Sequence, residues 1–272
     1  EVETDEGITG VMGSMSIDKT VRQIILNQLT PVIVGQDPLN YERLWERMFG
    51  REAVGWRKSI SKGEVVRALS VLDTAVWDII GKKLQTPLYK LLGGYRDQIP
   101  CYASGGHYIS LNSQADELKY LESEMARYME MGYTAVKMRV GRNISQDCER
   151  AKMVRDVIGP EVKLMMDFNT SASTHGGAPH AIKFMRAMEQ FDPFWFEDPL
   201  VMDDIAGMKK ITDAIDTAIA TGENEQTIWG FRDLIVNKAV DILLPDATHM
   251  CGGITEWRII AAMAEAFRMP VA

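Results

Sequence analysis

Short apolar segments in the second half of the chain each end on a polar or charged residue, and they recur roughly every 23 to 30 residues. The segments end at Lys137–Arg139, Asp167, Glu197–Asp198, Glu223–Asn224 and Asp246. A step of that length accommodates one strand, one helix and two short loops, which is the βα unit of a parallel sheet. The pattern therefore predicts neighbouring strands whose polar ends meet at one edge of the sheet.

Helical apolar spacing fills the intervals between these segments. A first strand is predicted at 99–103, and the helices are predicted at 115–131, 145–158, 179–191, 203–215, 230–238 and 253–267. Counting a fragment at the end of the chain gives seven strands. Strict alternation indicates a parallel sheet with right-handed crossovers. Polar residues at the carboxyl ends of successive strands favour a closed (β/α) barrel, because a doubly wound sheet gathers its ligands at one switch point.

The first 96 residues have a different pattern, with an opening strand followed mostly by helices. Helices are predicted at 17–29, which ends at Thr30-Pro31, at 40–49 with Asn40 as N-cap, and at 63–84, with a loop from Gly50 to Gly63. Asp73 and Asp78 in the third helix are interpreted as a buried cap or a surface charge. The sequence thus predicts an N-terminal α+β domain over 1–96 and a barrel domain over 97–272.

The two ends of the chain are abrupt. The chain opens without Met and closes on what resembles the start of another strand. A full barrel takes roughly 250 residues, more than 97–272 supplies. We therefore expect residues to be missing at both ends, including the first strand of the N-terminal domain, and the barrel to be incomplete.

Composition narrows the class of protein. Hydrophobic residues make up 46% and charged residues 25%, as in ordinary globular proteins, and the net charge of −8 gives no basic field for nucleic acid or anionic lipid. No apolar run approaches a membrane span, and no leader peptide is visible. Cys101, Cys148 and Cys251 are far apart, which predicts reduced thiols in a cytoplasmic protein.

Three acids in register at strand ends, Asp167, Glu197 and Glu223, predict a metal site. Hard oxygen ligands without His or Cys suit Mg²⁺ better than Zn²⁺. Lys137 and Arg139 are two residues apart, so their side chains share one face of a strand. On that face the two cations could bind a substrate carboxylate opposite the metal. The alternative interpretation is that they form ion pairs with the barrel acids.

The motifs together resemble the enolase superfamily, mandelate racemase / muconate lactonizing enzyme type, over nearly the whole chain. They are Lys137-Met-Arg139, Asp167-Phe-Asn169, Phe196-Glu197-Asp198-Pro199, Gly222-Glu223-Asn224 and Pro245-Asp246 with Gly252-Gly253. The resemblance implies a modified (β/α)7β barrel with an N-terminal capping domain. It also implies one Mg²⁺ per active site on the three acids, and abstraction of the α-proton of a carboxylate to give an enediolate.

Two departures from the family pattern bear on the reaction. In the mandelate racemase subgroup the acid at Asp246 orients a histidine base on the seventh strand, and none of His107, His175, His180 and His249 lies there. Either the chain continues to that histidine or the protein lacks the base. Arg139 stands where a two-base racemase has lysine, and arginine is a poor base but a good carboxylate clamp.

The resemblance and its departures favour a magnesium-dependent sugar-acid dehydratase of the hydro-lyase class. Lys137, Arg139 and Asp246 are the predicted catalytic residues, and Asn169, Asn224, His249 and His175 are the predicted substrate-binding residues. The alternatives are a racemase, epimerase or cycloisomerase on the same scaffold, or a non-catalytic sugar-acid-binding relative. The predicted partner is the sugar acid alone, with no nucleic acid and no membrane, and the family implies a homo-oligomer, from dimer to octamer.

Overall fold

The computed structural model describes residues 1–13, 17–50, 62–109, 111 and 113–272. The loop predicted between Gly50 and Gly63 therefore lies almost wholly outside the described residues. The chain divides into two compact units, of which the first comprises Glu1–Gln98, Gly222–Asp233 and Leu244–Ala272, and the second Ile99–Thr221 and Leu234–Leu243. The division into domains over 1–96 and 97–272 stays a prediction.

The first unit opens with a small hairpin, in which β1 (Val2–Glu3) pairs antiparallel with β2 (Thr9–Gly10). The next helical stretch consists of α1 (Lys19–Ile24), a π-helical turn (Ile25–Leu29) and α2 (Thr30–Ile33). The predicted end at Thr30-Pro31 is wrong. Proline lies in the first turn of α2, where its missing N–H would have no helical acceptor, so the chain stays helical.

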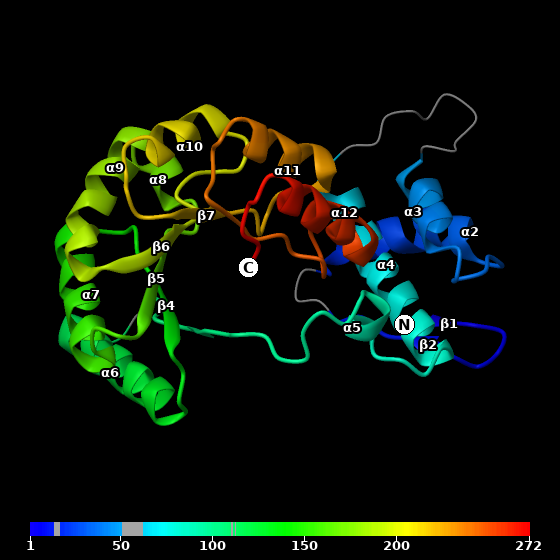
Figure 1. The fold of residues 1–272 in the computed structure, drawn as a ribbon, viewed down its shortest axis with the longest axis horizontal. Helices are drawn as coiled ribbons and strands as arrows, with labels where there is room; N and C mark the ends of the chain where they lie inside the picture. Colours follow the sequence, from blue (N-terminus) through cyan, green and yellow to red (C-terminus); the bar gives the residue numbers. More distant parts are fainter. Residues whose placement is uncertain (14–16, 51–61, 110, 112) are drawn as a thin grey trace. The chain divides into compact units, whose positions relative to one another are not determined.

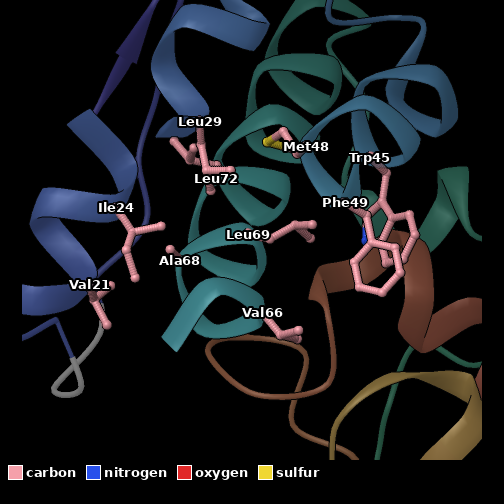
Figure 2. Close-up of a cluster of buried hydrophobic side chains, with 10 residues drawn as sticks. All are labelled: Val21, Ile24, Leu29, Trp45, Met48, Phe49, Val66, Ala68, Leu69 and Leu72. Carbon is pink, nitrogen blue, oxygen red and sulfur yellow. The ribbon is translucent and has the colours of Figure 1, made fainter. Parts of the chain in front are cut away.

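Two further helices of this unit, α3 (Tyr41–Phe49) and α4 (Glu64–Lys83), form its core with α1; a short helix, α5 (Leu88–Leu91), follows. Asn40 is at the N-cap position of α3, but its side chain makes no capping hydrogen bond. Figure 2 shows the buried cluster where α1, the π-helical turn, α3 and α4 meet: Val21, Ile24, Leu29, Trp45, Met48, Phe49, Val66, Ala68, Leu69 and Leu72. The apolar face of α4 thus organises the unit.

Helix α12 (Gly253–Ala266) also belongs to the first unit and begins against α4. The buried Asp73 carboxylate accepts hydrogen bonds from the Thr255 backbone N–H at 2.9 Å and from its hydroxyl at 2.6 Å. Asp78 is partly exposed and pairs with Lys82 at 2.7 Å. The structural roles predicted for Asp73 and Asp78 are confirmed: one is a buried cap, the other a surface charge.

The second unit is a parallel sheet whose six strands follow one another in chain order (Figure 1). They are β3 (Ala103–Ser104), β4 (Ala135–Arg139), β5 (Lys163–Asp167), β6 (Pro193–Glu197), β7 (Ile219–Thr221) and β8 (Ile242–Leu243). The first strand begins later than predicted, since Ile99 is 80% exposed and has no core to pack on. At the position predicted for a seventh strand, Val271 forms an isolated bridge. Sequential parallel order is the order of a (β/α) barrel.

Helices connect the strands of this sheet, as the alternation predicts. They are α6 (Gln114–Glu130), α7 (Ile144–Ile158), α8 (Ser171–Thr174), α9 (Gly177–Met188) with a 3₁₀ turn (Glu189–Phe191), α10 (Ile205–Thr212) and α11 (Thr227–Val236). In Figure 1, α6, α7 and α9 lie along one face of the strands. Within the described ranges, no helix combines the length and the apolar character that crossing a membrane requires.

Candidate active site

The carboxyl ends of β4, β5 and β6 bring four charged residues together. Arg139 is paired in register with Asp167, and Asp167 with Glu197. Because side chains on a strand alternate between faces, Lys137 lies on the same face as Arg139. Asp167 and Glu197 are each about 1% exposed, and Lys137 is buried as well.

The cations contact both acids directly. The Lys137 Nζ lies 3.0 Å from Asp167 Oδ2 and donates a short hydrogen bond to Glu197 Oε1. The Arg139 Nη1 lies 2.5 Å from the same Asp167 oxygen. The alternative interpretation of the two cations, an ion pair with the barrel acids, is thus seen in the structure. It leaves their role toward a substrate as a prediction.

Burial and mutual repulsion shift the protonation of this group. Burial, and then the neighbouring Asp167 carboxylate, raise the pKa of Glu197 to about 7, although Lys137 and Trp195 oppose the shift. Burial alone would lower the pKa of Lys137, but the attraction of Glu197 and Asp167 outweighs it and the pKa is raised. The lysine is therefore held as an ammonium between two carboxylates.

Two aromatic residues that the sequence analysis did not select support this group. The Trp195 indole N–H donates to Glu197 Oε2 at 3.0 Å, and its ring packs edge-on against Tyr102 at 5.6 Å. The Lys137 ammonium lies 5.6 Å from the centre of the Tyr102 ring. Trp195 precedes Glu197 by two residues on one strand, so the two-residue period would have identified it. Tyr102 lies just before a two-residue strand and has no such signal.

The residues after the strand ends take up left-handed backbone conformations. The φ angles of Asn169 and Asp198 are +46° and +43°, which is uncommon for residues other than glycine. The Asn169 N–H donates to Asp167 Oδ1 at 2.8 Å, and the Thr221 hydroxyl donates to Asp198. These turns hold the Asp167 carboxylate in place and leave the Asn169 side chain exposed beside it.

Four more of the predicted residues belong to the first unit. Glu223 and Asn224 follow β7 but belong to the first unit, where the Asn224 amide donates to Glu223 at 3.1 Å. Asp246 and His249 also belong to that unit, and the His249 Nδ1 lies 3.1 Å from Asp246 Oδ2. Asp246 thus has a histidine partner from its own loop.

His175 lies between the strand predicted to end at Asp167 and the helix predicted at 179–191, where the sequence pattern predicts only a loop, and this expectation is wrong. Residues 170–180 contain α8 and the start of α9, and His175 follows α8 directly. Its Nδ1 lies 2.8 Å from the Ser171 carbonyl oxygen, so the imidazole closes the end of that helix on the surface. A role for His175 toward substrate stays a prediction.

The donors at β5 and β6 fit a divalent cation. Asp167 and Glu197 present two buried carboxylates side by side, and no described residue donates a well-aligned hydrogen bond to Asp167 Oδ2. Hard carboxylate oxygens are the ligands that Mg²⁺ prefers. Among the described residues no group of three His, Cys, Asp or Glu side chains is assembled for a metal. Glu223 belongs to the other unit, so the three-ligand site stays a prediction.

Comparison with known proteins matches the chain to two family models. Residues 1–93 match the mandelate racemase / muconate lactonizing enzyme N-terminal domain, and residues 120–272 match the enolase C-terminal domain-like family. An arabinonate dehydratase of Saccharolobus solfataricus is 31% identical over 274 residues, covering 100% of this chain and 70% of that protein.

Two further relatives carry other activities in their names. A 3,6-anhydro-alpha-L-galactonate cycloisomerase of Streptomyces coelicolor is 32% identical, covering 98% of this chain and 71% of that protein. The crystal structure of a racemase from Streptomyces coelicolor A3(2) with bound magnesium has a TM-score of 0.86 and 31% identity, covering 99% of this chain and 72% of that one. The chain belongs to the mandelate racemase / muconate lactonizing enzyme family of the enolase superfamily.

Proposed function

We propose that the protein dehydrates a sugar acid in a Mg²⁺-dependent reaction that begins with abstraction of the proton α to the carboxylate. One observation carries the choice of dehydration over inversion: Arg139, not a second lysine, is the residue in register with Asp167, and its guanidinium lies 2.5 Å from that carboxylate. Arginine stays protonated in proteins, so this position supplies a fixed cation and no base.

The proposed reaction breaks two bonds in turn. The α C–H bond breaks first, and its electron pair forms an enediolate with the carboxylate. The β C–O bond then breaks, the hydroxyl leaves as water after protonation, and the enol tautomerises to a 2-keto-3-deoxy acid. One base is enough for this sequence, whereas inversion through a planar intermediate uses groups on both faces.

Each residue of the site has a role in this proposal. Asp167, Glu197 and Glu223 would hold the Mg²⁺, which when bound supplies Lewis-acid stabilisation of the developing negative charge. The Lys137 ammonium stands beside the two buried acids and would stabilise the same charge from the protein side. Arg139 would orient the substrate carboxylate, Asp246 would orient the base, and Asn169, Asn224 and His249 would bind sugar hydroxyls.

A racemase, epimerase or cycloisomerase is the second candidate. A relative named as a cycloisomerase matches 98% of the chain at 32% identity, as closely as the arabinonate dehydratase does. Lys137 would serve as a second base in such a reaction. The proposal also includes a homo-oligomer, from dimer to octamer, in the cytoplasm, and the three free cysteines support that compartment.

Proton exchange measured by NMR tests the proposal. The protein with Mg²⁺ in D₂O would be incubated with C4 to C6 sugar mono- and diacids. We expect loss of an α-proton signal together with a 2-keto-3-deoxy product. Exchange without loss of water would favour racemisation or epimerisation instead.

Glu197→Gln is the companion variant in this assay. We expect it to abolish metal-dependent turnover while circular dichroism stays unchanged, because the amide removes one anionic donor. Glu122→Gln, at an exposed position on α6, is the matched control. Normal turnover in Glu197→Gln would contradict the metal assignment.

A further inference from the structure

A cavity of about 370 Å³ opens beside the carboxyl ends of β3, β4 and β5. Its polar lining comes from the last residue of β4 and from the segments that follow the three strands: Arg139, and His107, Tyr108, Arg142, Asn169 and Ser171. The rest of its lining is apolar. Arg139 joins the cavity to the acids, because its guanidinium also contacts Asp167. A cavity of this size is within the range of small-molecule sites.

A buried carboxylate behind the cavity holds one of its walls in place. Asp147, on α7, is completely buried and accepts hydrogen bonds from the Tyr108 hydroxyl at 2.7 Å and from three successive backbone N–H groups, of Gly141, Arg142 and Asn143, at 3.0, 3.0 and 3.2 Å. One side chain thereby fixes both the loop after β4 and the tyrosine after β3. The position of this wall is thus set by a buried side chain of the second unit.

Two arginines flank the tyrosine of this wall. The guanidinium carbons of Arg142 and Arg150 lie 4.0 and 4.4 Å from the centre of the Tyr108 ring. Arg150 is buried and directs its charge inward, to Asp147 and to the Gly106 carbonyl oxygen. Arg142 is exposed at the cavity, and among the described residues no carboxylate forms an ion pair with it. Stacking holds its guanidinium at the wall while its charge stays available.

The other polar groups of the cavity are hydrogen-bonding groups without negative charge. Of the described residues that line the cavity, none is acidic. The Ser171 hydroxyl oxygen is buried and finds no hydrogen-bond partner in the described part of the chain, and a buried polar group without a partner favours a ligand that satisfies it. The lining thus combines a guanidinium available to a ligand, a histidine, an amide and a hydroxyl.

We propose that this cavity is the subsite for a second anionic group, at the end of the sugar acid remote from the reacting carboxylate. The inference rests on the proposed function and specifies its substrate class, a sugar diacid or another sugar acid with a terminal anion. Arg142 binds that group, and Ser171 and His107 complete its hydrogen bonding. Asp147 and Tyr108 are positioning residues that hold Arg142 at the wall.

Matched pairs of acids test this assignment. Galactarate and galactonate differ only at the terminal carbon, as do glucarate and gluconate, and 6-phosphogluconate replaces the terminal carboxylate by a phosphate. Dissociation constants would be measured by calorimetry with Mg²⁺, beside turnover by NMR. We expect the terminal anion to strengthen binding about tenfold or more, as a hydrogen-bonded charge contributes on that scale. The pair that gains more, carboxylate or phosphate, identifies the anion.

The Arg142→Gln variant should reduce the ratio of diacid to monoacid affinity about tenfold, and Arg142→Lys should restore part of it because the charge is kept. Arg186→Gln, at an exposed position on α9, is the matched control and should leave the ratio unchanged.

Three outcomes would overturn the subsite. The two acids of each pair could bind with equal affinity, Arg142→Gln could weaken the binding of both acids equally, or neither acid could bind. Selective, Arg142-dependent binding of the diacid without turnover would support the subsite and contradict the dehydratase.

Discussion

The Lys137 ammonium lies 3.0 Å from the Asp167 carboxylate, although Lys137 is paired in register with Met165, two residues earlier on β5. The lysine side chain therefore extends along the sheet toward its carboxyl end and reaches the acids of two neighbouring strands. Two cations therefore contact Asp167 from different positions on β4. Lys137 is paired two residues before Asp167, and Arg139 is paired with Asp167 itself.

Replacing that lysine should destabilise the unit when no divalent cation is present. In Lys137→Met, Glu197 would lose its cation while remaining buried beside Asp167. Breaking a buried ion pair costs about 3 to 5 kcal/mol. Added Mg²⁺ should recover part of this loss, because a ligand that binds only the folded state raises the free energy of unfolding. Urea unfolding with and without MgCl₂ measures both effects.

The matched control is Lys152→Met, which removes an exposed pair with Asp156 on α7. It should change the free energy of unfolding by less than about 1 kcal/mol, with no dependence on Mg²⁺. A Lys137→Met protein as stable as the wild type in the absence of Mg²⁺ would contradict the role assigned to this lysine.

A second prediction concerns the start of α12. Gly253 has a φ of +86°, and a Cβ atom added there would overlap the Asp73 Oδ2 oxygen. Gly253→Ala should therefore lower the free energy of unfolding for two reasons. The alanine takes up a left-handed backbone conformation, and its Cβ atom overlaps a buried carboxylate. Gly132→Ala is the control, since Gly132 has a φ of +82° and a Cβ atom added there would have nothing within 4 Å.

We expect Gly132→Ala to cost about 1 to 2 kcal/mol and Gly253→Ala about 2 kcal/mol more, as overpacking of a buried site does. Denaturant unfolding of the two variants compares them directly. Equal losses would show that the contact between Gly253 and Asp73 is not tight in solution.

Asp73 itself should make stability depend on pH. Burial, opposed by the hydrogen bonds from Thr255, raises the pKa of Asp73 from 3.8 to about 7, and Glu256 on α12 adds to the rise. Between these two pKa values, about 4 and 7, the carboxyl binds more protons in the folded state than in the unfolded state. Its contribution to stability is therefore complete below about pH 4 and is lost as the pH rises through about 7.

Asp73→Asn removes this titration while an amide of the same size can still pair with Thr255. The difference in free energy of unfolding between wild type and Asp73→Asn should fall by an amount on the order of 3 kcal/mol from pH 4 to pH 8. Urea unfolding across this range gives the difference at each pH. A difference independent of pH would mean that Asp73 is ionised throughout.

The sequence predicted the elements that carry the candidate site well where a period carried the information. The polar ends of β4, β5 and β6 stand out because side chains alternate along a strand and strand–helix units recur at similar lengths. The same periods predicted the helices between the strands to within a few residues. Contacts in register, such as Arg139 with Asp167, follow from that placement.

Long-range polar contacts had no such signal. Asp147 is one acid in the first turn of α7, and nothing in its surroundings indicates the tyrosine 39 residues earlier that donates to it. The pairing of Asp73 with Thr255 joins residues 182 apart. The helix α8 was missed because Thr170-Ser-Ala-Ser-Thr-His175 is rich in residues that favour turns, and a single helical turn has no apolar period.

The contact between Asp246 and His249 leads to the last prediction. A carboxylate beside an imidazole nitrogen orients the ring, and the His249 Nδ1 lies 3.1 Å from Asp246 Oδ2. If the two act as one group in the reaction, His249→Gln and Asp246→Asn should each lower kcat about a hundredfold, which is the low end of what acid–base catalysis contributes. The double variant should then lose little more than either single variant, because residues that act together are not additive.

His180→Gln, on α9, is the control and should keep its turnover. Losses that multiply in the double variant would show that Asp246 serves a different partner from His249, and kcat measured for all four proteins with one substrate distinguishes the two outcomes.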